Sequence, residues 1–140
     1  MKKVFITGGS GFLGKHLQCR LKNETCYEID APSSKDCNWS ESQIGNKYAD
    51  IEYDYIIHLA AWTQAGDFCL YHPGEQWIKN QKINTNILDW WCTSQKSAKL
   101  VFMGTSCSYS PSHELIEENY LKGEPIKSLY TYAMTKRMLQ

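Results

Sequence analysis

The sequence predicts an α/β fold built on a parallel sheet. Short apolar runs rich in β-branched and aromatic residues alternate along the chain with longer amphipathic stretches. Such an alternation produces right-handed βαβ units, whose strands are parallel and whose helices cover both faces of the sheet. The 140 residues, 42% of them hydrophobic, suit one globular domain, and no internal boundary or repeat is visible.

Two strands and a helix are expected in the first 34 residues. Residues 4–6 (Val-Phe-Ile) are short and apolar, as a buried parallel strand is. Leucines four residues apart then predict a helix with one buried face that ends near Asn23. Those leucines are Leu13, Leu17 and Leu21. Residues 26–30 form the second expected strand, which the turn-forming residues 31–34 stop.

The middle of the chain continues the alternation. A short helix is expected near residues 41–47, followed by a strand over 55–59 that leads into small residues. A helical pattern unbroken by glycine or proline extends from residue 75 to about 96. Residues 100–103 form the fourth expected strand.

The charge balance and the cysteines exclude several classes of partner. Fifteen basic and fifteen acidic residues cancel, so no overall field attracts nucleic acid or an anionic membrane. No apolar run is long enough for a membrane span or a signal peptide. The six cysteines contain no C-x-x-C pair and the four histidines no i, i+4 spacing, so neither a metal site nor a disulfide framework is indicated. We expect a cytoplasmic protein that binds a small polar ligand.

Four glycines fall within seven positions between the first strand and the first helix. They match G-x-G-x-x-G at residues 9, 11 and 14, or G-x-x-G-x-x-G at residues 8, 11 and 14. An acidic residue, Asp30, ends the next strand about twenty residues later, as the dinucleotide-binding fingerprint requires. Glycine lets the backbone approach a pyrophosphate, whose charge then meets free N–H groups at a helix N-terminus. The alternative is a glycine-rich turn without a ligand.

Asp30 bears on the choice of cofactor. Its carboxylate can accept hydrogen bonds from the ribose hydroxyls but would repel a 2′-phosphate, so it favours NAD over NADP. The alternative is an aspartate that caps a helix or a turn. The residues predicted to bind the cofactor in this region are Gly8, Gly11, Phe12, Leu13, Gly14 and Asp30.

Three motifs in register resemble a known family. TGGSGFLG (7–14), HLAA (58–61) and YAMTK (132–136) are similar to those of the extended short-chain dehydrogenase/reductases, the NAD-dependent nucleotide-sugar epimerases and dehydratases. MGTSCSY (103–109) and the segment 72–88 most resemble the GDP-fucose synthase branch, which epimerises and then reduces a GDP-4-keto-6-deoxymannose. The resemblance implies a Rossmann-type, doubly wound parallel sheet and hydride transfer between nicotinamide and a sugar carbon.

The resemblance also implies a catalytic set. Tyr132 would be the general acid/base, and Lys136, four residues on and therefore on the same helix face, would bind the nicotinamide ribose and lower the tyrosine's pKa. Thr105 matches the family's catalytic Ser or Thr, and Cys107 matches a cysteine that fucose synthases use as an acid/base in epimerisation. The alternatives are that Tyr132 is a half-buried aromatic, that Lys136 lies on a solvated helix face and that Cys107 is a small buried residue.

Further cofactor contacts follow from the resemblance. Small residues where the third strand ends would let the cofactor approach, and the implied contacts there are Leu59, Ala60 and Ala61. Asn80 matches an asparagine that opens the following helix. We expect His58 to be a hydrogen-bonded strand-end residue and the tryptophans to be core or interface residues. Trp90 and Trp91 could contribute to the four-helix-bundle homodimer common in the family.

Two departures from the pattern concern cofactor and substrate. Fucose synthases usually prefer NADPH, whereas Asp30 favours NAD, and WTQAGD (62–67) differs from the Gly-Gly loop typical of that branch. Family members also continue past the Tyr-Lys helix into a C-terminal substrate domain. We therefore expect residues 1–140 to be a dinucleotide-binding domain that is incomplete at its C-terminus. The different-class alternative is a non-catalytic NAD-binding module or an inactive fragment.

Overall fold

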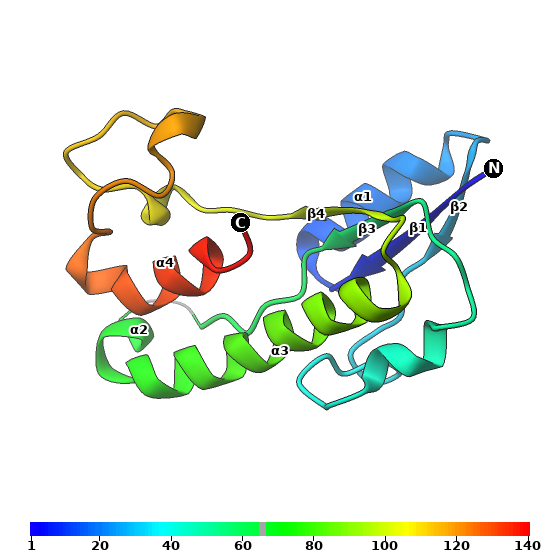
Figure 1. The fold of residues 1–140 in the computed structure, drawn as a ribbon, viewed down its shortest axis with the longest axis horizontal. Helices are drawn as coiled ribbons and strands as arrows, with labels where there is room; N and C mark the ends of the chain where they lie inside the picture. Colours follow the sequence, from blue (N-terminus) through cyan, green and yellow to red (C-terminus); the bar gives the residue numbers. More distant parts are fainter. Residues whose placement is uncertain (65–66) are drawn as a thin grey trace. The chain divides into compact units, whose positions relative to one another are not determined.

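The computed structural model describes residues 1–64 and 67–140 of the chain. Its elements, with η denoting 3-10 helices, follow one another as in Figure 1. They are β1 (Lys2–Thr7), α1 (Phe12–Lys22), β2 (Tyr27–Asp30), η1 (Ile44–Tyr48), β3 (Tyr55–His58), α2 (Phe68–Tyr71), α3 (Pro73–Ser94), β4 (Lys99–Phe102), η2 (Ser106–Ser108), η3 (Glu117–Asn119), η4 (Lys127–Leu129) and α4 (Tyr130–Arg137).

The chain divides into two compact units. The first comprises residues 1–61 and 82–102, and the second comprises residues 62–81 and 103–140. Helix α3 contributes its N-terminal part to the second unit and its C-terminal part to the first.

The first unit contains the predicted parallel sheet. Its four strands lie in the order β2-β1-β3-β4, and every neighbouring pair is parallel. The chain moves from β1 to β2 on one side and then crosses to β3 on the other, so the strand order reverses at β1. In sheets of this kind ligands bind beyond the carboxyl ends of the strands at such a switch point. Thr7 and His58 are register partners there, at the ends of β1 and β3.

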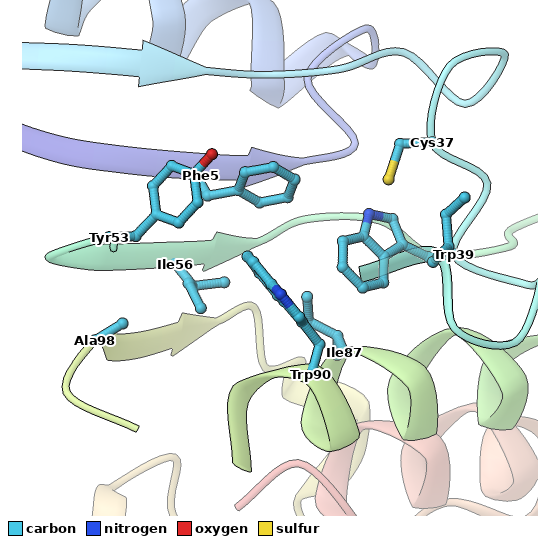
Figure 2. Packing of buried hydrophobic residues seen from close by; sticks show 9 residues of the cluster. Phe5, Cys37, Trp39, Tyr53, Ile56, Ile87, Trp90 and Ala98 are labelled. Atoms are coloured by element: carbon cyan, nitrogen blue, oxygen red, sulfur yellow. The ribbon is translucent and has the colours of Figure 1, made fainter. Parts of the chain in front are cut away.

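The sheet is covered on both faces, as the sequence predicts. Figure 1 shows α1 and α3 on opposite sides of the strands. On the α3 side, Figure 2 shows Phe5 and Ile56 of the sheet packed with Ile87 and Trp90 of α3. Val4, beside Phe5 in β1, is also buried and faces the other way, because strand side chains alternate. The apolar run of β1 is therefore buried on both faces.

Three expectations about individual elements need correction. Leu13 is 45% exposed, so the buried face of α1 begins only with Leu17, which is half-buried like Leu21. The short helix expected near residues 41–47 is the 3-10 helix η1, entered through Gln43 in a left-handed backbone conformation. Trp90 is 3% exposed within the core cluster of the unit, which leaves no surface for the dimer contact considered for it.

The described residues show neither a membrane-spanning helix nor a metal-binding cluster. Within residues 1–64 and 67–140, no helix is both long and apolar enough to cross a bilayer. The same residues contain no group of three or more His, Cys, Asp or Glu side chains arranged to hold a metal ion. All six cysteines carry free thiols.

Candidate functional site

The glycine loop after β1 packs against the chain that follows β3. Gly8 has a positive φ of 68°, and a Cβ there would lie 2.8 Å from the Ala60 nitrogen, inside van der Waals contact. A Cβ on Gly14 would overlap the carbonyl oxygen of Gly8 and the backbone of Gly9. The loop therefore requires glycine at both positions for steric reasons, and this close packing brings the TGGSGFLG and HLAA motifs together.

Thr7 and His58 hold these two segments in place. The Thr7 hydroxyl oxygen accepts hydrogen bonds from the backbone N–H groups of Leu59 (3.1 Å) and Ala60 (3.0 Å). The same hydroxyl forms a 2.8 Å hydrogen bond with Nδ1 of His58. His58 Nε2 lies 3.3 Å from Oδ1 of Asn84. This buried, hydrogen-bonded His58 confirms the expected strand-end role.

The loop leads into a helix N-terminus that suits a phosphate. Gly11 occupies the N-cap of α1 and supplies no side-chain cap, so the first N–H groups of the helix, including those of Phe12 and Leu13, have no partner from a cap side chain. Gln18 donates from Nε2 to the carbonyl oxygens of Gly9 (2.8 Å) and Gly14 (3.2 Å), and these two bonds hold the glycine loop against α1. Free amides, a fixed glycine backbone and no acidic residue in the first turn fit a dinucleotide pyrophosphate.

Asp30, at the end of β2, has a partner that sequence reasoning missed. The Tyr53 hydroxyl donates a hydrogen bond of 2.6 Å to Oδ2 of Asp30. Tyr53 is 3% exposed, and its burial, together with this bond to a carboxylate, raises the pKa of the phenol well above its ordinary value. A carboxylate accepts about four hydrogen bonds, so Asp30 keeps capacity for ribose hydroxyls.

The second unit contains all four predicted catalytic residues. Thr105 follows β4 in extended conformation, and its hydroxyl oxygen accepts a 3.2 Å bond from the Cys107 N–H, which caps η2. Helix α4 contains Tyr132 and Lys136, one turn apart. Thr105, Cys107 and Tyr132 are half-buried, whereas Lys136 is 8% exposed.

Ser108 and Arg137 join η2 to α4 within this unit. The Ser108 hydroxyl, fully buried, donates to the Ala133 carbonyl oxygen at 3.3 Å. Arg137 donates through Nε to the Ser108 carbonyl oxygen at 2.8 Å and through Nη1 to the Gly123 carbonyl oxygen at 2.9 Å. These contacts fix the Thr-Ser-Cys segment against the Tyr-Lys helix. Ser108 lies in the MGTSCSY motif, but the motif assigns no role to it or to Arg137, because their role depends on backbone groups that lie far away along the chain.

The electrostatics of Tyr132 differ from the resemblance's implication. Burial raises the pKa of Tyr132, the Thr105 side chain acts in the opposite direction, and the Cys107 and Cys69 thiols raise it further. Burial also lowers the pKa of Lys136. The described residues therefore do not produce the lowered tyrosine pKa expected from the lysine, because desolvation of the phenolate outweighs the favourable interaction with Thr105.

A small cavity adjoins Tyr132 within the second unit. Its volume is about 230 Å³, and the residues lining it come from the chain after β3, from α2, α3 and η4, and from α4. The lining residues are Thr63, Gln64, Cys69, Gln76, Leu129 and Tyr132. Thr63 and Gln64 belong to the segment 62–67 that departs from the family pattern, of which Ala65 and Gly66 lie outside the described residues.

The resemblance implies that Asn80 opens a helix, but the structure places it well inside α3. It is 2% exposed, accepts a hydrogen bond from the Trp62 N–H at 3.0 Å and donates to the Trp62 carbonyl oxygen at 2.8 Å. A third bond reaches the Gln76 carbonyl oxygen at 2.9 Å. Asn80 therefore anchors the chain that follows β3, and a direct contact with the cofactor stays a prediction.

The predicted residues thus form two groups. The glycine loop, Asp30 and residues 59–61 belong to the first unit, whereas Asn80 and the four catalytic candidates belong to the second. Within the first group the glycine loop contacts the HLAA segment, and within the second the Thr105 side chain acts to lower the pKa of Tyr132.

The chain resembles enzymes of nucleotide-sugar metabolism. It is 28% identical to the GDP-L-colitose synthase of Yersinia pseudotuberculosis over 140 residues, covering 96% of this chain and 44% of that protein. It is 28% identical to a probable GDP-L-fucose synthase of Drosophila melanogaster, covering 99% of this chain and 44% of that protein. The chain therefore spans less than half the length of these relatives.

Solved structures and a family model agree with this similarity. A GDP-L-fucose synthetase of Naegleria fowleri bound to NADP superposes with a TM-score of 0.84 at 26% identity, covering 99% of this chain and 45% of that one. The model of the NAD dependent epimerase/dehydratase family matches residues 4–140. With its parallel sheet, glycine loop and Tyr-Lys helix, the chain belongs to the NAD dependent epimerase/dehydratase family.

Proposed function

We propose that this chain contributes the cofactor-binding and acid/base residues of an enzyme that epimerises or reduces a nucleotide sugar. The substrate class is a GDP-linked 4-keto-6-deoxyhexose, on the similarity to GDP-L-fucose and GDP-L-colitose synthases. One observation carries the proposal: the segment that contains Thr105 is hydrogen-bonded through Ser108 to helix α4, in which Tyr132 lies one turn from the buried Lys136. A non-catalytic binding module has no need of this arrangement.

The roles follow from the chemistry of each side chain. Tyr132 exchanges a proton with the oxygen of the reacting sugar carbon, and Thr105 orients that oxygen by hydrogen bonding. The nicotinamide, when bound, supplies or accepts the hydride. Lys136 binds the nicotinamide ribose. When cofactor and substrate hold Lys136 and Tyr132 in place, the ammonium of Lys136 stabilises the phenolate form of Tyr132. Cys107 serves as the acid/base that inverts the carbon beside the ketone.

We further propose that the cofactor is NAD. Asp30 presents a carboxylate where the ribose hydroxyls are expected, and its negative charge opposes a 2′-phosphate. The similar structure from Naegleria fowleri is bound to NADP, so the preference has to be measured on this protein.

The substitution Tyr132→Phe tests the activity. In the natural polypeptide that contains these residues, kcat/KM with GDP-4-keto-6-deoxymannose should fall by about 10²–10⁴-fold, because the proton donor is lost while the ring is kept. Tyr130→Phe is the matched control, since Tyr130 lies on the same helix and is 44% exposed. Unchanged turnover in Tyr132→Phe would contradict the proposal and favour a binding module.

A further inference from the structure

Gln76 has a buried side chain that the proposed chemistry does not use. The residue lies in α3 and is 1% exposed. Among the residues that the structure describes, neither Oε1 nor Nε2 of its amide has a hydrogen-bond partner. A buried amide left without partners is unfavourable, and native proteins contain few of them. Such a group calls for a ligand or a water that completes its hydrogen bonds.

The position of Gln76 indicates what that ligand is. Gln76 and Tyr132 line the same cavity, whose volume is about 230 Å³. Pockets for drug-sized ligands measure about 300–1,000 Å³, so this cavity suits one part of a ligand, such as a sugar ring, better than a whole nucleotide sugar. Since Tyr132 is the proposed proton donor to the oxygen on the reacting carbon, the ring bound here is the reacting hexose.

The chemistry of the amide narrows the contact further. A glutamine side chain offers one acceptor oxygen and a donor NH₂ group, and a pair of neighbouring hydroxyls offers a donor and an acceptor in return. In a 4-keto-6-deoxyhexose the carbon on one side of the ketone bears the C3 hydroxyl, which is followed by the C2 hydroxyl, whereas the other side leads to the methyl group. Only the first side can satisfy the amide.

We propose that Gln76 binds the C2 and C3 hydroxyls of the hexose and selects substrates that carry the C3 hydroxyl. This inference rests on the proposed function, because it places the reacting sugar beside Tyr132. It assigns a specificity role to a residue outside the Tyr-Lys-Thr set. A site built to hydrogen-bond a hydroxyl discriminates strongly against an analogue that lacks it, since the protein group is then left unpaired.

The test compares two probes, GDP-4-keto-6-deoxymannose and its 3-deoxy analogue, on the natural polypeptide. The unmodified protein should prefer the 3-hydroxy sugar in kcat/KM by about tenfold or more. Gln76→Met keeps the length of the side chain and removes both polar atoms, so the preference should fall to within about twofold. Its thermal stability should be unchanged or higher, because an unpaired buried amide is removed.

Gln81→Met is the matched control. Gln81 lies on the same helix, its Oε1 also has no partner among the described residues, and it does not line the cavity. This variant should keep the tenfold preference. If Gln76→Met keeps it as well, the amide is satisfied by a buried water and the inference is wrong.

The Tyr132→Phe variant separates this inference from the proposed function. Loss of turnover in Tyr132→Phe together with an unaltered preference in Gln76→Met would overturn only the role of Gln76. Unchanged turnover in Tyr132→Phe would overturn both, because the cavity would then not be the reaction site.

Discussion

The buried Tyr53 hydroxyl donates a 2.6 Å hydrogen bond to the carboxylate of Asp30, twenty-three residues away along the chain. Tyr53 comes just before β3, and Asp30 ends β2, so the bond connects segments that are not neighbours in the sheet. Its effect is to hold one carboxylate oxygen in a fixed position at the edge of the proposed ribose site. Asp30 is therefore oriented before any cofactor binds.

This relationship predicts how cofactor preference depends on Asp30. Asp30→Ser removes the charge that opposes a 2′-phosphate, so the ratio of the Kd for NADP to the Kd for NAD should fall by about tenfold or more. Tyr53→Phe leaves the charge of Asp30 but removes the hydrogen bond that orients its carboxylate. This variant should weaken NAD binding by a smaller factor, about two- to tenfold. Isothermal titration calorimetry on the natural polypeptide measures both.

Tyr27→Phe supplies the control for these variants, because Tyr27 begins the same strand and has no side-chain role in the proposed site. Its affinities should match those of the unmodified protein. An unchanged ratio in Asp30→Ser would show that Asp30 is a turn residue without a part in cofactor choice.

The strands and the main helices could be predicted from the sequence because their signals are local. The apolar run of β1 and the uninterrupted pattern of α3 need no knowledge of distant residues. The glycine loop could be found for the same reason, since its spacing follows from the geometry of a strand-to-helix turn.

The supporting residues of the site could not be predicted in this way. Tyr53, Gln18 and Gln76 become important through contacts and burial that depend on the folded chain. Motif spacing says nothing about desolvation, which raises the pKa of Tyr132 here. The resemblance puts Asn80 at a helix start, although α3 begins seven residues earlier at Pro73.

The core beneath the sheet predicts a large difference between two isoleucines of α3. Ile87 is fully buried against the sheet, whereas Ile78 is 55% exposed. Ile87→Ala should lower the free energy of unfolding by about 2–5 kcal/mol, because it removes buried methyl groups and leaves a cavity. Ile78→Ala should change it by about 0.5 kcal/mol or less. Urea unfolding followed by circular dichroism compares them, and equal losses would contradict the assigned packing of α3.

The environment of Cys37 predicts selective alkylation. Burial raises the pKa of the Cys37 thiol to about 11, so at pH 8 only about a thousandth of it is the reactive thiolate. Cys19, Cys26 and Cys92 are exposed. Iodoacetamide at pH 8 followed by peptide mass spectrometry should therefore modify these three and spare Cys37, until urea unfolds the protein. Rapid labelling of Cys37 in the native protein would show that its segment opens readily.

The burial of Lys136 predicts that replacing this lysine by an uncharged residue stabilises the protein, by an amount that depends on pH. Burial lowers the pKa of Lys136 in the folded protein below its unfolded value, which is about 10.4. The charged form is thus disfavoured by folding, and this cost is fully present below the folded pKa and disappears as the pH rises past the unfolded pKa. Lys136→Met should therefore unfold at a higher temperature than the unmodified protein at pH 7, and the difference should shrink as the pH approaches 10.

The exposed Lys127, in η4 of the same unit, supplies the control. Lys127→Met should shift the unfolding temperature little at either pH, because its ammonium remains in water in the folded protein. Differential scanning calorimetry across this pH range distinguishes the outcomes. A Lys136→Met variant that is less stable at every pH would mean that favourable contacts of the ammonium exceed its desolvation, and the lysine would then be a structural residue as well as the proposed ribose ligand.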